Sequence, residues 1–317
     1  MTAEKQQVIT APVLVLVGPT AIGKTELALA MARRFGCEII SVDSMQVYRH
    51  MDIGTAKPSL EERGGVPHHL IDIVDPREQY DAARFVEDAL RAINTIVSRG
   101  NIPLLTGGTG LYLKALTEGL FEAAFSDEAI RSRLNRRLRQ EGGESLYREL
   151  QAVDPGTAAR LHVNDGQRLT RALEIFYGTG VPWSVHLRRQ PDRRAGFSRL
   201  LLLCLSCERD SLYERIEHRT GRMMAQGFVQ EVEKLLDMGY SPDLKAMQAI
   251  GYRHVNKYLA GEWGRAETIR LLVRDTRRYA KRQLTWFRAN PAMNWYDRED
   301  ANIVMDHVGR FLGSVKK

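Results

Sequence analysis

A glycine-rich loop between an apolar run and a helical pattern constrains the fold of this chain more than any other feature. The run "PVLVLV" (12–17) is continuous and rich in valine, as expected of a strand that is buried on both faces of a sheet. The pattern "TELALAMARRF" (25–35) has the apolar spacing of a helix. Between them stands a full match to the phosphate-binding pattern G-x-x-x-x-G-K-[ST], formed by Gly18, Pro19, Thr20, Ala21, Ile22, Gly23, Lys24 and Thr25.

The residue types of this loop suit an anion. Its glycines allow backbone N–H groups to curl around a phosphate, and the following helix adds the partial positive charge of its N-terminus. We expect Lys24 to reach phosphate oxygens and Thr25 to ligate Mg²⁺. Because the loop recognises phosphate oxygens and not the group attached to them, a nucleotide and another diphosphate compound remain alternatives.

Apolar runs and helical patterns alternate along much of the chain. Four more strands are predicted, at 37–44, 68–75, 101–108 and 199–206. This alternation is typical of an α/β fold with a parallel sheet. We therefore predict a P-loop NTPase-like core that begins in 1–120, a helical insertion domain over 121–198, and a region over 199–317. That last region would supply one more core strand and then remain helical to the end.

The charge of the chain is concentrated in its helical parts. The formal net charge of the 317 residues is +7, which permits nucleic-acid binding without proving it. Residues 126–199 hold 14 arginines against 9 acidic residues, and residues 265–290 hold 8 arginines or lysines against 2. The run "RRYAKRQLTWFR" (277–288) interleaves these cations with aromatic residues. It suits an RNA backbone with stacked bases, or equally a basic helix packed on the core.

Other polar residues follow the predicted strands. Asp43 would lie at the carboxyl edge of the sheet, where it could hold a metal, act as a general base or merely cap a helix. The second glycine turn, 107–110, ends a strand at the same edge.

Arg215, Arg219 and Arg222 share one helix face, which is either an anion clamp or a solvated surface.

Three features favour a structural interpretation or leave the choice open. Asp72 and Asp75 end an apolar run, where an ATPase could hold its metal or the chain could simply turn. The pair His68-His69 has no further ligand at metal-binding spacing, so we expect no metal there. Cys204 and Cys207 form a lone CxxC in an apolar run and are predicted to be strand residues, since three cysteines in all are too few for a disulfide framework.

Taken together, the motifs resemble the bacterial tRNA dimethylallyltransferases, also called isopentenyltransferases. Matching segments run in the family's order from about residue 12 to 290, and the most specific are "DSMQVYRHMDIGTAKP" and "PHHLIDI". Ile22 is a departure, because the family more often has serine there. That position contributes mainly a backbone N–H, so we expect little consequence. The zinc-finger extension of eukaryotic relatives is absent from the sequence.

The resemblance implies a substrate for the loop. It would hold the diphosphate of dimethylallyl diphosphate, and the prenyl group would pass, with Mg²⁺, to the exocyclic amine of the adenosine immediately 3′ of the anticodon in tRNA. Asp43 would act on that amine, while Thr109 and Arg219 would stabilise the departing diphosphate. The RNA-contacting positions of the family correspond here to Asp43, Ser44, Met45, Gln46, Thr109, Arg131, Gln167, Arg168, Leu169, Thr170, Arg171, Arg253, Arg277, Arg278, Lys281 and Arg282.

The expected partners are therefore the anticodon stem-loop of tRNA and dimethylallyl diphosphate. We expect a cytoplasmic monomer without a membrane segment, because no apolar stretch approaches the length of a bilayer span. Three alternatives remain: an adenylate isopentenyltransferase that acts on free AMP, a P-loop nucleotide kinase, and a P-loop RNA-binding module without transferase activity.

Overall fold

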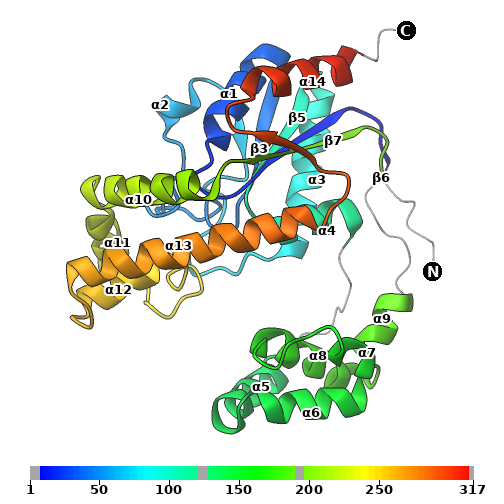
Figure 1. Ribbon diagram of the computed structural model, residues 1–317, viewed down its shortest axis with the longest axis vertical. Coiled ribbons are helices and arrows are strands. Elements are labelled where there is room, and N and C mark those ends of the chain that lie inside the picture. Colours follow the sequence, from blue (N-terminus) through cyan, green and yellow to red (C-terminus); the bar gives the residue numbers. More distant parts are fainter. Residues whose placement is uncertain (1–7, 120–126, 190–195, 314–317) are drawn as a thin grey trace. The chain divides into compact units, whose positions relative to one another are not determined.

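The chain divides into two compact units. The structure, a computed structural model, describes residues 8–119, 127–189 and 196–313 (Figure 1). One unit lies within 1–118 and 195–317, and the other within 119–194. The predicted helical insertion, 121–198, thus overlaps the second unit almost completely.

The first unit is built on a six-stranded sheet. Its strands, in spatial order, are β4 (His68–His69), β3 (Cys37–Val42), β5 (Ile102–Gly107), β2 (Val13–Val17), β7 (Leu200–Ser206) and β8 (Asn294–Asp297). Every neighbouring pair is parallel, which confirms the predicted α/β class. β2 lies at the centre of the sheet, and all five of its residues are buried, as its continuous apolar sequence requires.

The first unit also contains nine helices within the described ranges. They are α1 (Lys24–Phe35), α2 (Leu60–Arg63), α3 (Ala82–Ser98), α4 (Gly110–Glu118), α10 (Arg209–Ala225), α11 (Phe228–Asp237), α12 (Tyr252–Leu259), α13 (Arg265–Arg288) and α14 (Ala301–Gly313). Of these, α1, α3 and α14 contact the sheet. α1 packs against α14, while α10 runs beside the long α13 (Figure 1). None of the helices in the described ranges combines the length and the apolar character that crossing a bilayer requires.

The second unit is a small helical body with its own core. It contains α5 (Glu128–Glu141), α6 (Gly143–Val153), α7 (Pro155–Ala158), α8 (Gly166–Thr179) and α9 (Trp183–Arg189). Leu134, Leu146 and Leu173 are completely buried in that core. Asp127 caps α5 by accepting two backbone N–H groups. The apolar helix faces that form this core, together with the Asp127 cap, explain why this arginine-rich segment is helical.

Several predicted elements need correction. The strand predicted over 68–75 is only the two residues of β4, because Leu70 (φ 61°) and Asp72 (φ 58°) take left-handed conformations that end the extended chain. The region predicted to be helical after the last core strand is divided at Gly227 (φ 98°) into α10 and α11. The prediction of helix to the end of the chain was wrong, since β8 adds an edge strand.

No sequence pattern predicted the second, two-stranded sheet. β1 (Val8–Ile9) pairs in parallel with β6 (Gly196–Phe197). Strands of two residues are too short to show a hydrophobic period, so pattern analysis could not detect them.

Candidate active site

The predicted phosphate loop joins the central strand to α1. Gly18 has φ 151°, and a Cβ added there would lie 2.7 Å from the carbonyl oxygen of Leu205. Gly23 has φ 105° and directly precedes α1. These two positions therefore require glycine for separate reasons, close backbone approach and a left-handed turn. The Ile22 side chain is buried in the core beneath the loop, so the departure from serine at this position replaces a polar group by packing.

Lys24 is held over this loop. Its Nζ donates to the carbonyl oxygens of Gly18 and Pro19, at 2.9 and 2.8 Å. Burial, and after it the charge of Arg219, lowers the pKa of the Lys24 ammonium to about 8, while the charge of Asp43 acts in the opposite direction. A bound anion would favour the charged ammonium, so the lowered pKa marks a site that is prepared for negative charge.

The arginine stripe of α10 faces the loop. Arg219 Nη1 donates to Thr20 Oγ1 at 2.8 Å, and Arg215 Nε donates to the carbonyl oxygen of Ala21 at 2.7 Å. Arg222 lines the same pocket. Burial lowers the pKa of the Arg219 guanidinium, whereas the charge of Asp43 raises it. The arrangement favours the anion-clamp interpretation over the solvated surface.

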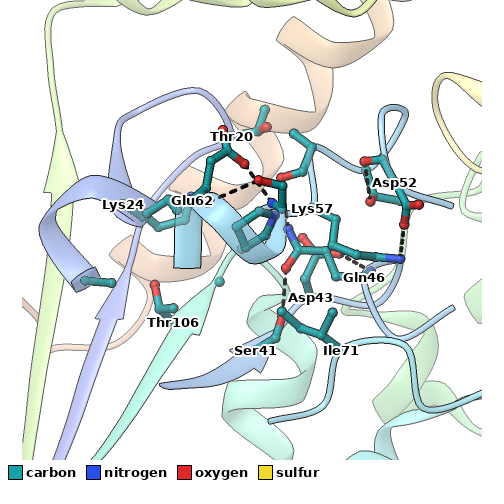
Figure 2. Close-up of a pocket in the computed structure, with 18 of the residues that line it drawn as sticks. Thr20, Lys24, Ser41, Asp43, Gln46, Asp52, Lys57, Glu62, Ile71 and Thr106 are labelled. Atoms are coloured by element: carbon teal, nitrogen blue, oxygen red, sulfur yellow. Dashed lines mark hydrogen bonds and ion pairs between the residues drawn. The ribbon is translucent and has the colours of Figure 1, made fainter. Parts of the chain in front are cut away.

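Asp43 lies where β3 ends and is fixed by a local turn. Its Oδ1 accepts the backbone N–H groups of Met45 (2.8 Å) and Gln46 (3.3 Å). The next backbone N–H, of Ser44, donates to Thr109 Oγ1 at 3.1 Å. The predicted second glycine turn is thereby tied to the Asp43 turn, and Figure 2 shows Asp43 and Gln46 in one pocket with Lys24.

Gln283 on α13 is a site residue that the sequence analysis missed. Its Oε1 accepts the backbone N–H of Thr20 at 2.8 Å, and its Nε2 donates to the carbonyl oxygen of Gly108 at 2.9 Å. Ala280, Gln283 and Phe287 follow helical spacing and are all buried, but this spacing does not reveal the distant groups to which Gln283 bonds. The two interpretations of the run 277–288 rest on its cations and aromatic residues, and Gln283 enters neither of them.

The pocket bounded by these groups has a volume of about 930 Å³, which is enough for a substrate of moderate size. It extends towards α2, where Lys57 Nζ binds Asp52 (2.6 Å) and Asp72 (2.5 Å). Asp72 is thus held by a lysine. Asp75 instead accepts the hydroxyl of Tyr240 at 2.8 Å and does not line the pocket. Neither aspartate therefore has the setting of an ATPase metal ligand.

Metal-binding groups are sparse in the described ranges. No cluster of three or more His, Cys, Asp or Glu side chains there could hold an ion. His69 Nε2 is instead paired with Glu38 at 2.6 Å, and Cys204 is buried in β7. Thr25, at the exposed first turn of α1, lines the pocket with Lys24. Thr25 would be one protein ligand of an Mg²⁺ ion that is held mainly by its own waters and by phosphate oxygens.

The RNA-contacting residues predicted on α12 and α13 are mostly accessible. Arg278, Lys281 and Arg282 are exposed along α13. Arg277 is ion-paired with Glu217 of α10. Arg253, at the start of α12, binds Asp275 at 2.7 Å.

In the second unit the predicted run 167–171 is divided by the turn of α8. Gln167 and Arg168 are exposed, whereas Leu169 (0%) and Thr170 (4%) are buried in the interior of the unit. The side chains of those two residues lie inside the unit, because a helix turns some of any five successive residues inward. Arg171 remains partly exposed.

Arg131 and Arg171 converge on one buried carboxylate. Each guanidinium lies 2.9 Å from an oxygen of Glu174, whose side chain is buried. Both arginines keep part of their surface in solvent, with side-chain exposures of 39% and 32%. The buried glutamate therefore holds two cations at the surface of the second unit, in an orientation that loops alone would not fix.

Known proteins of one enzyme family are similar in sequence to this chain. The sequence model of the IPP transferase family matches residues 46–290. The "tRNA dimethylallyltransferase" of Desulfotalea psychrophila is 54% identical over 305 residues, which is 96% of each chain. That of Geobacter sulfurreducens is 51% identical over 284 residues, covering 90% of this chain and 91% of the relative.

Solved structures are also similar. The tRNA isopentenylpyrophosphate transferase of Bacillus halodurans superposes with a TM-score of 0.70 at 39% identity and covers 98% of both chains. A eukaryotic dimethylallyltransferase acting on tRNA gives a TM-score of 0.75 at 30% identity, over 91% of this chain and 74% of that one. The similarity therefore spans the sheet, the phosphate loop and the helical parts together.

Proposed function

The chain belongs to the IPP transferase family, and from this membership we propose that it transfers a dimethylallyl group to tRNA. The donor is dimethylallyl diphosphate, and the acceptor is the exocyclic amine of the adenosine immediately 3′ of the anticodon. The products are N6-dimethylallyladenosine in tRNA and diphosphate. The observation that carries the proposal is the pocket in which the phosphate loop with Lys24 and the carboxylate of Asp43 meet.

The loop end of the pocket binds the diphosphate. Lys24, Arg219 and Thr109 supply positive charge or hydrogen bonds for a group that gains negative charge as the bond between carbon and oxygen breaks. In water-excluded sites such donors contribute on the order of 3 kcal/mol each to the transition state. Thr25 would hold Mg²⁺, and the ion would supply further positive charge against the departing diphosphate.

Asp43 acts at the other reacting atom. An exocyclic adenine amine is a weak nucleophile, and positive charge builds on its nitrogen as the new carbon–nitrogen bond forms. A carboxylate within reach of the amine accepts its proton or orients it for attack. The Met45 and Gln46 N–H groups fix Asp43 Oδ1, so the carboxylate is oriented before the substrate arrives. The target base must leave the anticodon-loop stack to reach the pocket.

The exposed cations bind the RNA backbone. Arg278, Lys281 and Arg282 on α13 are suited to phosphate contacts, as are Arg131 and Arg168 of the second unit. Affinity for tRNA should therefore fall steeply with salt. We further propose that the protein works in the cytoplasm, where tRNA is available, and as a monomer.

Incubation with radiolabelled dimethylallyl diphosphate, Mg²⁺ and either unmodified tRNA or AMP tests this function. Label should enter tRNA alone, and it should be lost when the adenosine 3′ of the anticodon is replaced by another nucleotide. Label in AMP would instead identify an adenylate isopentenyltransferase. Tight tRNA binding without any transfer would leave only an RNA-binding module.

A further inference from the structure

The helix α13 has two faces with different surroundings. Arg278, Lys281 and Arg282 lie on its exposed face, where the proposed function places RNA. Gln283 and Phe287 are turned inward and buried at 4% and 2% exposure. In Figure 1 the helix runs as one unbroken rod beside α10, so a restraint on either face acts on the same rigid element.

The amide of Gln283 joins this helix to both phosphate-facing turns. One of its atoms accepts from Thr20 in the P-loop, and the other donates to Gly108 in the second glycine turn. The fit around the amide is close, because a Cβ added at Gly108 would lie 2.1 Å from Nε2. Glutamine is suited to this task, since its side chain ends in one acceptor and one donor group. Glutamate would lose the donor, and methionine would lose both groups.

We propose that Gln283 is a positioning residue that couples RNA binding on α13 to diphosphate binding in the P-loop. This inference rests on the function proposed above. RNA held on the exposed face restrains α13, and the Gln283 amide passes that restraint to Thr20 and Gly108. Binding of the first ligand then supplies the free energy that ordering the two turns requires. The second ligand therefore binds more tightly. By linkage, diphosphate must strengthen RNA binding by the same factor.

The test measures diphosphate affinity with and without RNA. Isothermal titration of inorganic diphosphate with Mg²⁺ gives one dissociation constant for the free protein and one for the protein saturated with an unmodified anticodon stem-loop. For the native chain we expect about 5- to 50-fold tighter binding with RNA, within the usual range of coupling between sites. In Gln283→Met the ratio should fall close to one while RNA still binds.

Two further variants separate coupling from general damage. Thr285→Val alters an exposed residue on the same helix and should keep the native ratio. Gln283→Glu keeps the acceptor for Thr20 but loses the donor to Gly108, and it should also lose most of the coupling. If Gln283→Met does not fold, as judged by circular dichroism, the same criterion applies to Gln283→Glu.

The outcomes distinguish this inference from the proposed function. A native ratio of one, or a native ratio retained in the Gln283 variants, would overturn the coupling while leaving prenyl transfer intact. Failure of the native chain to bind the stem-loop at all would instead refute the proposed function, and the coupling with it.

Discussion

Replacement of Lys24 by methionine should remove both affinity for diphosphate and a specific pH dependence of that affinity. Burial and the nearby Arg219 lower the pKa of the Lys24 ammonium to about 8. The ammonium is therefore charged below pH 8, and its contribution to anion binding is lost as the pH rises through 8. Between pH 7 and pH 9 the charged fraction falls about tenfold, which corresponds to about 1.4 kcal/mol of binding free energy.

The assay is isothermal titration of inorganic diphosphate with Mg²⁺ between pH 6.5 and 9.5. Diphosphate itself titrates in this range, so the informative quantity is the ratio of the native affinity to that of Lys24→Met. The ratio should be largest at low pH and should fall about tenfold between pH 7 and pH 9. A ratio that stays constant with pH, or equal affinities at pH 7, would refute the assignment of Lys24 as the diphosphate-binding cation.

Three other substitutions test separate parts of the account. Asp43→Asn should lower kcat by about two to four orders of magnitude with tRNA binding retained, because the amine loses its base. A near-native rate of prenyl transfer in a single-turnover assay would exclude that role. Arg131→Ala should weaken tRNA binding and reduce the slope of log affinity against log salt by about one, since one phosphate contact is lost; an unaltered slope would mean that Arg131 only stabilises Glu174. Gly18→Ala should destabilise the chain or distort the loop, because its Cβ would meet the Leu205 carbonyl oxygen at 2.7 Å; an unchanged Tm together with unchanged diphosphate affinity would contradict the close approach.

The parts of the fold that could be predicted are those with long, regular patterns. β2 and β7 are buried apolar runs, and α1 and α3 have clear helical spacing, so both the strand–loop–helix unit and the parallel sheet followed from sequence. The strand at β4 was predicted too long, because the sequence "HHLIDIVD" does not indicate that Leu70 and Asp72 have positive φ. The edge strand β8 carries a mixed polar and aromatic sequence, which resembles a turn or a helix end as much as a strand.

The site was predictable where a residue acts through a local motif. The phosphate loop and the position of Asp43 at a strand end need only short-range order. Gln283 could not be placed in this way, since it bonds to residues 263 and 175 positions away in the chain. Leu169 and Thr170 were predicted as part of a run carried over by resemblance, and sequence alone did not show that helix geometry buries their side chains.

In the proposed reaction the phosphate loop holds the leaving diphosphate of a prenyl donor and not a phosphoryl group to be transferred. The most direct measurement combines mass spectrometry of nucleosides from reacted tRNA with quantification of released diphosphate. We expect one diphosphate to be released for each adenosine that gains a C5H8 unit, without any requirement for ATP. Phosphate transferred from ATP to an acceptor, with no prenylated adenosine formed, would contradict it.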